Sequence, residues 1–199
     1  LASRNSSKPA VRTTMRGGMR GLRKMELQYN AMSKSLTTVD TGAAVTAFAV
    51  HDHARCIEDA LARARNACRE RGARLTGLRE QVLRLVWQSH RPVGAYALLD
   101  LLGATAGRRR PGPPTVYRTL EFLCEQGLVH RVESLNAYIG CQIGIGPHDH
   151  ELYICRGCGR TLETEQPSIR QVVDVYASGV GFSVESMTLE VLGLCPACS

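Results

Sequence analysis

The sequence feature that most constrains the fold is a repeated pair of cysteines, each pair with two residues between its members. Cys155 and Cys158 stand in "CRGC", and Cys195 and Cys198 stand in "CPAC" about forty residues later. Two such pairs can place four thiolates around one small cation, which is the donor set of a closed structural zinc site. We therefore predict that one zinc ion holds these two distant segments together.

The same cysteines have two alternative interpretations, disulfide bonds and a thiol redox pair. Disulfides need an oxidising compartment, and a thioredoxin-like pair uses one motif near a βαβ pattern rather than two. The basic N-terminal segment lacks the apolar stretch and cleavage site of a secretory signal. No apolar run approaches membrane-spanning length. Structural zinc in a cytoplasmic protein, with no membrane partner, is the preferred interpretation.

The net charge of +7 is distributed unevenly along the 199 residues. Residues 1–50 carry eight basic and two acidic side chains, and residues 51–131 carry fourteen and eight. Residues 132–199 carry only three basic side chains against eight acidic ones. A basic region beside an acidic one rich in metal ligands suggests nucleic acid as one partner and a cation as the other.

The pattern along the chain predicts a basic, disordered tail over residues 1–50 and two modules over residues 51–134 and 135–199. Apolar residues at helical spacing predict four helices in the first module. They are expected from about His51 to Gly72 and over residues 75–90, 94–104 and 115–127. Residues 107–114, "GRRRPGPP", are expected to form a non-helical loop.

Two short strands, "LVHRVES" and "NAYIG", follow the fourth helix and predict a hairpin. Short helices followed by a hairpin are the pattern of a winged helix-turn-helix, whose last helix enters the major groove of DNA. Thr115, Tyr117 and Arg118 stand opposite the apolar face of that helix, where arginine can pair with guanine. A plain helical bundle with exposed side chains is the alternative interpretation.

The second module reads as a strand, a zinc turn, a second strand, a helix from about Ser168 and a last strand over "MTLEVLGLC". We therefore predict an α+β protein, with a winged helix-turn-helix domain followed by a small α/β dimerisation domain that contains the four-cysteine zinc site.

A second group of possible ligands lies between the modules. It comprises His130, Cys141, His148, His150 and Glu163. Imidazole, thiolate and carboxylate together suit zinc. Solvated histidines and an ordinary core thiol are the alternatives. Because these ligands span the junction of the two modules, a bound metal would fix their relative orientation and so act as a switch.

The stretches "PPTVYRTLEFLCEQGLVHRVES", "CRGCG" and "GLCPAC" together resemble the ferric uptake regulator family. "AYALLDLL" and "VHRVES" followed by "NAY" are most similar to its zinc uptake regulator branch. The resemblance runs from about Ala54 to Cys198. It implies a homodimeric, zinc-responsive repressor that binds operators of zinc uptake genes, with about two zinc ions per chain.

The resemblance also implies roles for individual residues. The structural ion falls on the four paired cysteines, and the regulatory ion falls on His130, Cys141, His148 and Glu163, with His150 as the alternative to His148. The expected DNA contacts are Tyr96, Thr115, Tyr117, Arg118 and Arg79. Gly77 and Leu78 depart from the proline and glutamine that the family has before this arginine.

Three rival functions remain open at this stage. A relative in the same family that senses iron, manganese or peroxide is one, although the Cys141 thiolate favours zinc. A zinc-ribbon thiol oxidoreductase and a structural adaptor are the others. The sequence has no catalytic triad, phosphate loop or metalloprotease motif, so we expect a protein that is not an enzyme and has no small-molecule substrate.

Overall fold

The structure, a computed structural model, describes residues 47–49, 52–105, 111–146 and 148–199. Of the tail predicted over residues 1–50, only residues 47–49 lie within this part of the chain. Residues 40–170 and 185–199 belong to one compact unit, and residues 171–184 belong to a second. Both groups of predicted metal ligands lie in the first of these units.

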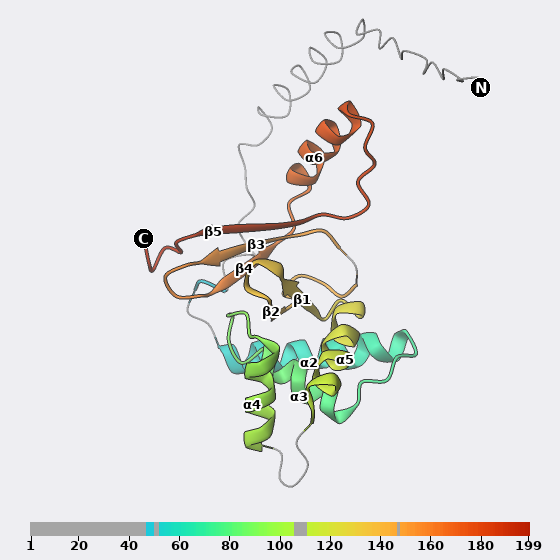
Figure 1. Cartoon of the computed structure of the whole chain (residues 1–199), viewed down its shortest axis with the longest axis vertical. Coiled ribbons are helices and arrows are strands. Elements are labelled where there is room, and N and C mark those ends of the chain that lie inside the picture. The colour runs from blue at the N-terminus through green and yellow to red at the C-terminus, as the bar shows by residue number, and fades with distance from the viewer. Residues whose placement is uncertain (1–46, 50–51, 106–110, 147) are drawn as a thin grey trace, which may run out of the picture. The chain divides into compact units, whose positions relative to one another are not determined.

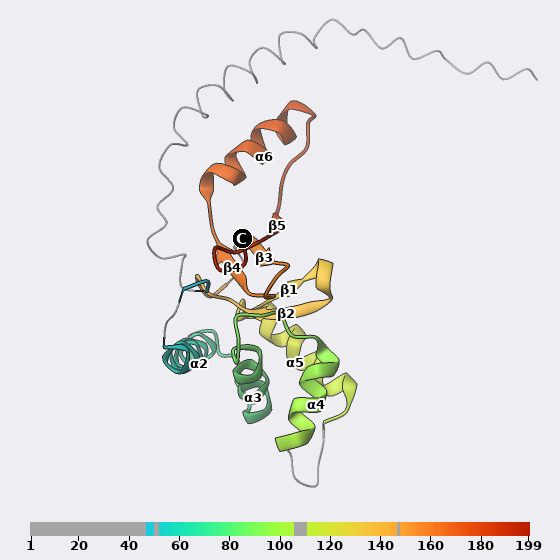
Figure 2. The ribbon, with the colours of Figure 1, turned by 90° about the vertical axis from the view of Figure 1, so that its left-hand side faces the viewer.

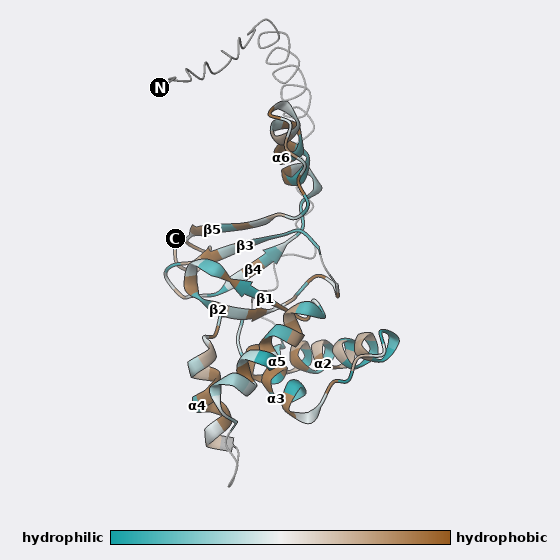
Figure 3. Cartoon of the chain, turned by 45° about the vertical axis from the view of Figure 1, so that its right-hand side comes forward, coloured by the Kyte–Doolittle hydropathy of each residue, from teal (hydrophilic) through white to brown (hydrophobic). Residues whose placement is uncertain are grey.

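Four helices open the larger unit (Figure 1): α2 His53–Glu70, α3 Gly77–Val86, α4 Ala95–Thr105 and α5 Pro113–Glu125. They share one hydrophobic core, in which Leu61, Leu83, Leu98 and Leu120 are at most 1% exposed. Hydrophobic and hydrophilic residues alternate along these helices (Figure 3), as expected for helices that bury one face. The four predicted helices are therefore present, with ends that differ by a few residues.

The helix ends show where local signals were sufficient. Thr76 caps α3 as predicted, and its side chain accepts a hydrogen bond from the N–H of Arg79 at 3.4 Å. The prediction that the loop extends to Pro114 is wrong, because α5 begins with Pro113 and Pro114. The first helical positions tolerate proline, since their N–H groups have no partner within the helix.

A two-stranded hairpin follows α5, made of β1 Val129–Val132 and β2 Ala137–Gly140. A short 3₁₀ turn, Glu133–Leu135, joins the strands, so the hairpin crosses the boundary predicted between residues 134 and 135. Val93 and Tyr138 exchange backbone hydrogen bonds of 2.8 and 2.9 Å, which attach the hairpin to the segment before α4. Both views place the hairpin between the helices and the other sheet (Figures 1 and 2).

The second sheet has three strands in the order β4-β3-β5: β3 His150–Cys155, β4 Thr161–Thr164 and β5 Thr188–Gly193. The pairing of β3 with β4 is antiparallel, whereas that of β3 with β5 is parallel. The parallel register pairs Cys155 with Gly193, so both cysteine pairs follow the same end of the sheet. The predicted α+β class and four-cysteine site are confirmed.

The last helix, α6 Pro167–Gly179, contains no buried residue among those described. Its predicted apolar face is present in the sequence but remains partly exposed, and Tyr176 is 53% exposed. Among the described residues, no helix has both the length and the hydrophobicity needed to span a bilayer.

Candidate metal centres and DNA-binding face

The four paired cysteines come together at one end of the three-stranded sheet. Cys155 ends β3, Cys158 lies in the following turn, and Cys195 and Cys198 follow β5. Their four sulfur atoms all lie within 4.8 Å of one another, and all four thiols are free of disulfides. A Cβ added to Gly157 would lie 2.9 Å from Cys198 Cβ, so a glycine allows this close approach.

Backbone N–H groups favour the thiolate form of Cys155 in this cluster. The N–H groups of Cys158 and Cys195 hydrogen-bond to the Cys155 sulfur, the latter at 3.2 Å, and lower the pKa of Cys155 to about 6. The thiolate is the form that binds metal. Four convergent sulfurs, one of them already favoured as thiolate, fit a structural zinc ion.

The second predicted group also converges, although its members come from three segments: β1, the loop between β2 and β3, and β4. His130 lies on β1, Cys141 follows β2, His148 precedes β3, and Glu163 lies on β4. One ligand atom from each lies within 4.8 Å of the others. The cluster therefore joins the hairpin to the three-stranded sheet.

Glu163 is at the centre of this cluster and is only 2% exposed. Its Oε1 lies 2.9 Å from Nε2 of both His130 and His148, and its Oε2 accepts a 2.5 Å hydrogen bond from the N–H of Gln142. Burial would raise the pKa of Glu163, but the contact with His130 and the other hydrogen bonds lower it to about 2. Glu163 is therefore a carboxylate, the form that binds metal.

Two of the other three donors, Cys141 and His148, have pKa values raised above their ordinary values. Burial, followed by the negative charge of Glu163, raises the pKa of Cys141 to about 12. Burial would lower the pKa of His148, but hydrogen bonds to Glu163 and to the Gly146 carbonyl raise it overall. A cation that enters this cluster must displace the protons that these two side chains hold.

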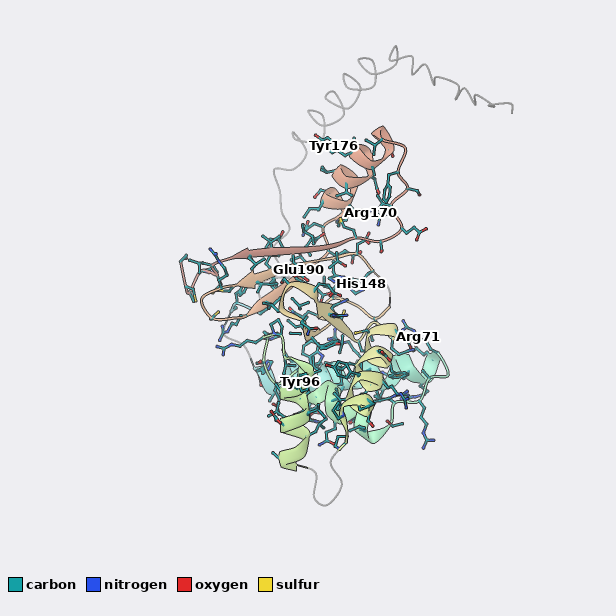
Figure 4. The ribbon with its side chains drawn as sticks, in the orientation of Figure 1. Arg71, Tyr96, His148, Arg170, Tyr176 and Glu190 are labelled. Atoms are coloured by element: carbon teal, nitrogen blue, oxygen red, sulfur yellow. The ribbon has the colours of Figure 1, made fainter. Side chains whose placement is uncertain are left out.

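His150, the predicted alternative to His148, occupies a neighbouring position. Its ring lies 3.9 Å, centroid to centroid, from that of His130. Burial and then the charge of His130 lower the pKa of His150. His148, labelled in Figure 4, contributes to the convergent group, whereas His150 does not.

Two supporting residues have no signal in the local sequence. Arg71, at the end of α2, donates hydrogen bonds to the carbonyls of Gln126 and Ile145 at 2.8 and 3.0 Å, and so fixes the loop between Cys141 and His148. Glu190, on β5, accepts hydrogen bonds from two backbone N–H groups at the end of the hairpin. These donors are Glu133 and Ser134, at 2.6 and 3.1 Å. Both residues are labelled in Figure 4.

The side chains predicted to contact DNA differ in how exposed they are to solvent. Tyr96 is 71% exposed on α4, and Tyr117 is 37% exposed on α5. Thr115 and Arg118, also on α5, are exposed. Arg79 is partly buried, because its guanidinium lies 3.4 Å from the centre of the Phe122 ring and donates to the Arg74 carbonyl.

Comparisons with known proteins bear on these features together. The model of the "Ferric uptake regulator family" matches residues 70–192. The chain belongs to the ferric uptake regulator family. It is 39% identical over 142 residues to the zinc uptake regulation protein of Escherichia coli (strain K12), which covers 71% of this chain and 82% of that protein.

Two further comparisons place the chain within the family. Identity to the ferric uptake regulation protein of Synechococcus elongatus is 28% over 131 residues, covering 65% of this chain and 88% of that protein. A solved structure described as a zinc uptake regulator complexed with zinc and DNA matches with a TM-score of 0.66 and 38% identity. It covers 71% of this chain and 93% of the solved chain. The similarity groups this chain with the zinc uptake regulator branch.

Proposed function

We propose that this protein is a zinc-responsive transcriptional repressor that binds operators of zinc uptake genes as a zinc-loaded homodimer. The observation that carries the proposal is the convergence of His130, Cys141, His148 and Glu163 between the hairpin and the three-stranded sheet. The relatives named above, one of them solved with zinc and DNA, support it.

The donor set supports zinc as the sensed metal. Zinc supplies a Lewis-acid centre that imidazole, thiolate and carboxylate can share in a tetrahedral arrangement. Iron(II) and manganese(II) sites favour nitrogen and oxygen donors, whereas Cys141 offers sulfur. We expect about two ions per chain from these two clusters, one on the four cysteines and one on the mixed group.

The chain's own residues explain how metal occupancy can control DNA binding. His130 belongs to the hairpin next to α5, whereas Glu163 belongs to the three-stranded sheet. When both bind one ion, the hairpin and sheet are held in one relative orientation. A change from mostly incompetent to mostly competent for DNA needs about 3–5 kcal/mol of differential binding, which a few metal-ligand bonds can provide.

The exposed face of α5 supports the DNA-binding role. Arg118 can make a bidentate pair with guanine, and Tyr117 can contact phosphate or a thymine methyl group. Tyr96 on α4 and Thr115 would add contacts beside them. We place Arg79 in a supporting role, because its guanidinium already packs on Phe122.

The proposal of a homodimer rests on exposed apolar side chains. Leu192 and Leu194, at the end of β5, are 51% and 55% exposed, and Tyr176 of α6 is 53% exposed. Large apolar side chains left exposed in each of the two units are candidates for burial against a second copy of the chain.

The deciding experiment measures fluorescence anisotropy of an operator-like duplex against protein at buffered free zinc concentrations, with zinc per chain counted in parallel. We expect DNA binding to appear only as the ion of the mixed cluster is added to a protein that already holds the four-cysteine ion. Full binding without that ion would leave a constitutive DNA-binding protein or adaptor. The same titration with iron(II) and manganese(II) tests the rival metals.

A further inference from the structure

A third group of metal ligands lies in the helical part of the molecule, apart from the two clusters described above. His53 and Cys56 lie in the first turn of α2, and their three-residue spacing places them on one face of that helix. His90 follows α3 in the connection to α4. One donor atom from each of the three residues lies within 4.8 Å of the others, and the two imidazole ring centroids are 4.7 Å apart.

This arrangement is close to what a zinc ion needs. Zinc–nitrogen bonds of about 2.0–2.1 Å and a zinc–sulfur bond of about 2.3 Å place tetrahedral donors roughly 3.3–3.6 Å apart. The donor atoms, now within 4.8 Å of one another, would have to move closer together when an ion binds. Two imidazoles and one thiolate form a donor set that suits zinc, and cobalt(II) can replace it as a spectroscopic probe.

Two cavities adjoin the three donors. A cavity of about 470 Å³ is lined by Cys56, Asp59 and His90 among others. A second cavity, of about 310 Å³, has His53, His90 and Arg160 in its wall. These cavities bring solvent next to Cys56 and His90, whereas both ring nitrogens of His53 are buried. Water from the cavities can take the fourth position.

His90 connects this group to the three-stranded sheet. Its backbone carbonyl accepts a 2.7 Å hydrogen bond from the N–H of Thr161, the first residue of β4. Strand β4 also carries Glu163, a member of the mixed cluster. An ion on His53, Cys56 and His90 would therefore fix the start of α2 and the end of α3 next to that strand.

We propose that His53, Cys56 and His90 form a third zinc site, open at one position, which attaches the start of α2 to the segment after α3. The site adds an ion to the two that the proposed function requires, and its existence does not depend on DNA binding. Its measurable effects are a third ion per chain and a higher midpoint of thermal unfolding.

The first experiment counts ions on the full chain by equilibrium dialysis against buffered zinc, followed by elemental analysis. The test variants are Cys56→Ser and His90→Gln, and the matched control is Cys124→Ser, a partly buried cysteine outside all three groups. We expect three ions on the wild type and on the control, and two on each test variant. Saturation of the wild type at two ions would overturn the proposal, as would a third ion retained by both test variants.

A second measurement needs no substitution and identifies the thiol. Alkylation of the wild type with iodoacetamide, followed by peptide mass spectrometry, reports the modification rate of each cysteine. Between two and three equivalents of zinc, the rate at Cys56 should fall at least tenfold, while the rate at Cys124 stays constant. An unchanged rate at Cys56 would contradict the proposal even if a third ion were counted. In that case the ion would lie elsewhere.

Discussion

The two predicted metal clusters differ in how their ligands are distributed over the fold. The four cysteines come from the ends of two paired strands, whereas the mixed cluster draws on the hairpin, the loop between β2 and β3, and β4. In the first cluster backbone amides lower the pKa of Cys155 to about 6, while hydrogen bonds to Cys195 and the other cysteines raise that of Cys198 to about 12. In the second, burial raises the pKa of Cys141 to about 12. An ion in the first cluster would join two strands of one sheet, whereas an ion in the second would join the hairpin to the three-stranded sheet.

The largest expected effect tests whether the four-cysteine cluster stabilises the fold. Cys155→Ser removes one of four thiolates. Apparent binding energies of structural zinc are about 10–16 kcal/mol, against a total stability of about 5–15 kcal/mol for a typical domain. We expect loss of cooperative unfolding in the sheet region, measured by circular dichroism during heating. Cys124→Ser, in α5, should unfold close to the wild type, and similar melting of both variants would contradict a structural role for the four cysteines.

The second prediction tests whether the mixed cluster controls DNA binding. Cys141→Ala and His130→Ala should keep the fold, but zinc should no longer strengthen their binding to the operator. At saturating zinc, we expect each variant to bind the operator about tenfold to a hundredfold more weakly than the wild type. Anisotropy titrations with and without zinc measure this loss. His150→Ala is the matched control, because His150 contacts His130 but lies outside the convergent group. If His150→Ala abolished the response and His148→Ala preserved it, the assignment of His148 would be wrong.

The third prediction concerns pH. The pKa of Cys141 without metal, about 12, lies above the accessible range, so zinc binding to this cluster releases a proton from the thiol. The raised pKa of His148 adds a further proton at the lower end of the range. Zinc affinity of the mixed cluster should therefore rise by about tenfold per pH unit or more between pH 6.5 and 8. Competition with a chelator at three pH values measures this zinc affinity. An affinity that does not change with pH would exclude Cys141 as a ligand.

The smallest expected effect concerns DNA specificity. Arg118→Ala should weaken operator binding by about 1–3 kcal/mol and weaken binding to random duplex less, because a bidentate contact to guanine reads sequence. Parallel titrations of both duplexes measure the difference. An equal loss on both would make Arg118 a phosphate contact. Neither outcome should change the zinc affinity of either cluster.

Much of the fold could be predicted because the relevant signals are local. The Thr76 cap, the buried leucines at helical spacing and the cysteine pairs each reflect chemistry within a few residues of chain. The prediction of a loop over Pro113 and Pro114 is wrong, because proline breaks a helix at interior positions but is favoured in the first turn. Nothing in the sequence shows which of the two roles applies.

The remaining features depend on contacts between distant segments. Arg71 reaches Ile145 across 74 residues, and no local pattern marks it as a support for the mixed cluster. His53 and Cys56 have the spacing of a ligand pair on a helix, but their third partner is more than thirty residues away. A search for His-x-x-Cys spacing at helix starts would have found two of the three donors, and only the fold brings His90 to them.

The contact of Glu190 with the hairpin bears on how the molecule would move. Its carboxylate holds the N–H groups of Glu133 and Ser134 without any help from a metal. Loss of the ion from the mixed cluster would therefore release the hairpin at one end only. We expect the resulting motion to be a rotation about the Glu133–Ser134 end, with amide hydrogen exchange at these two residues remaining slow throughout. In a dimer, such a rotation changes the spacing between the two DNA-binding faces while each face stays internally intact.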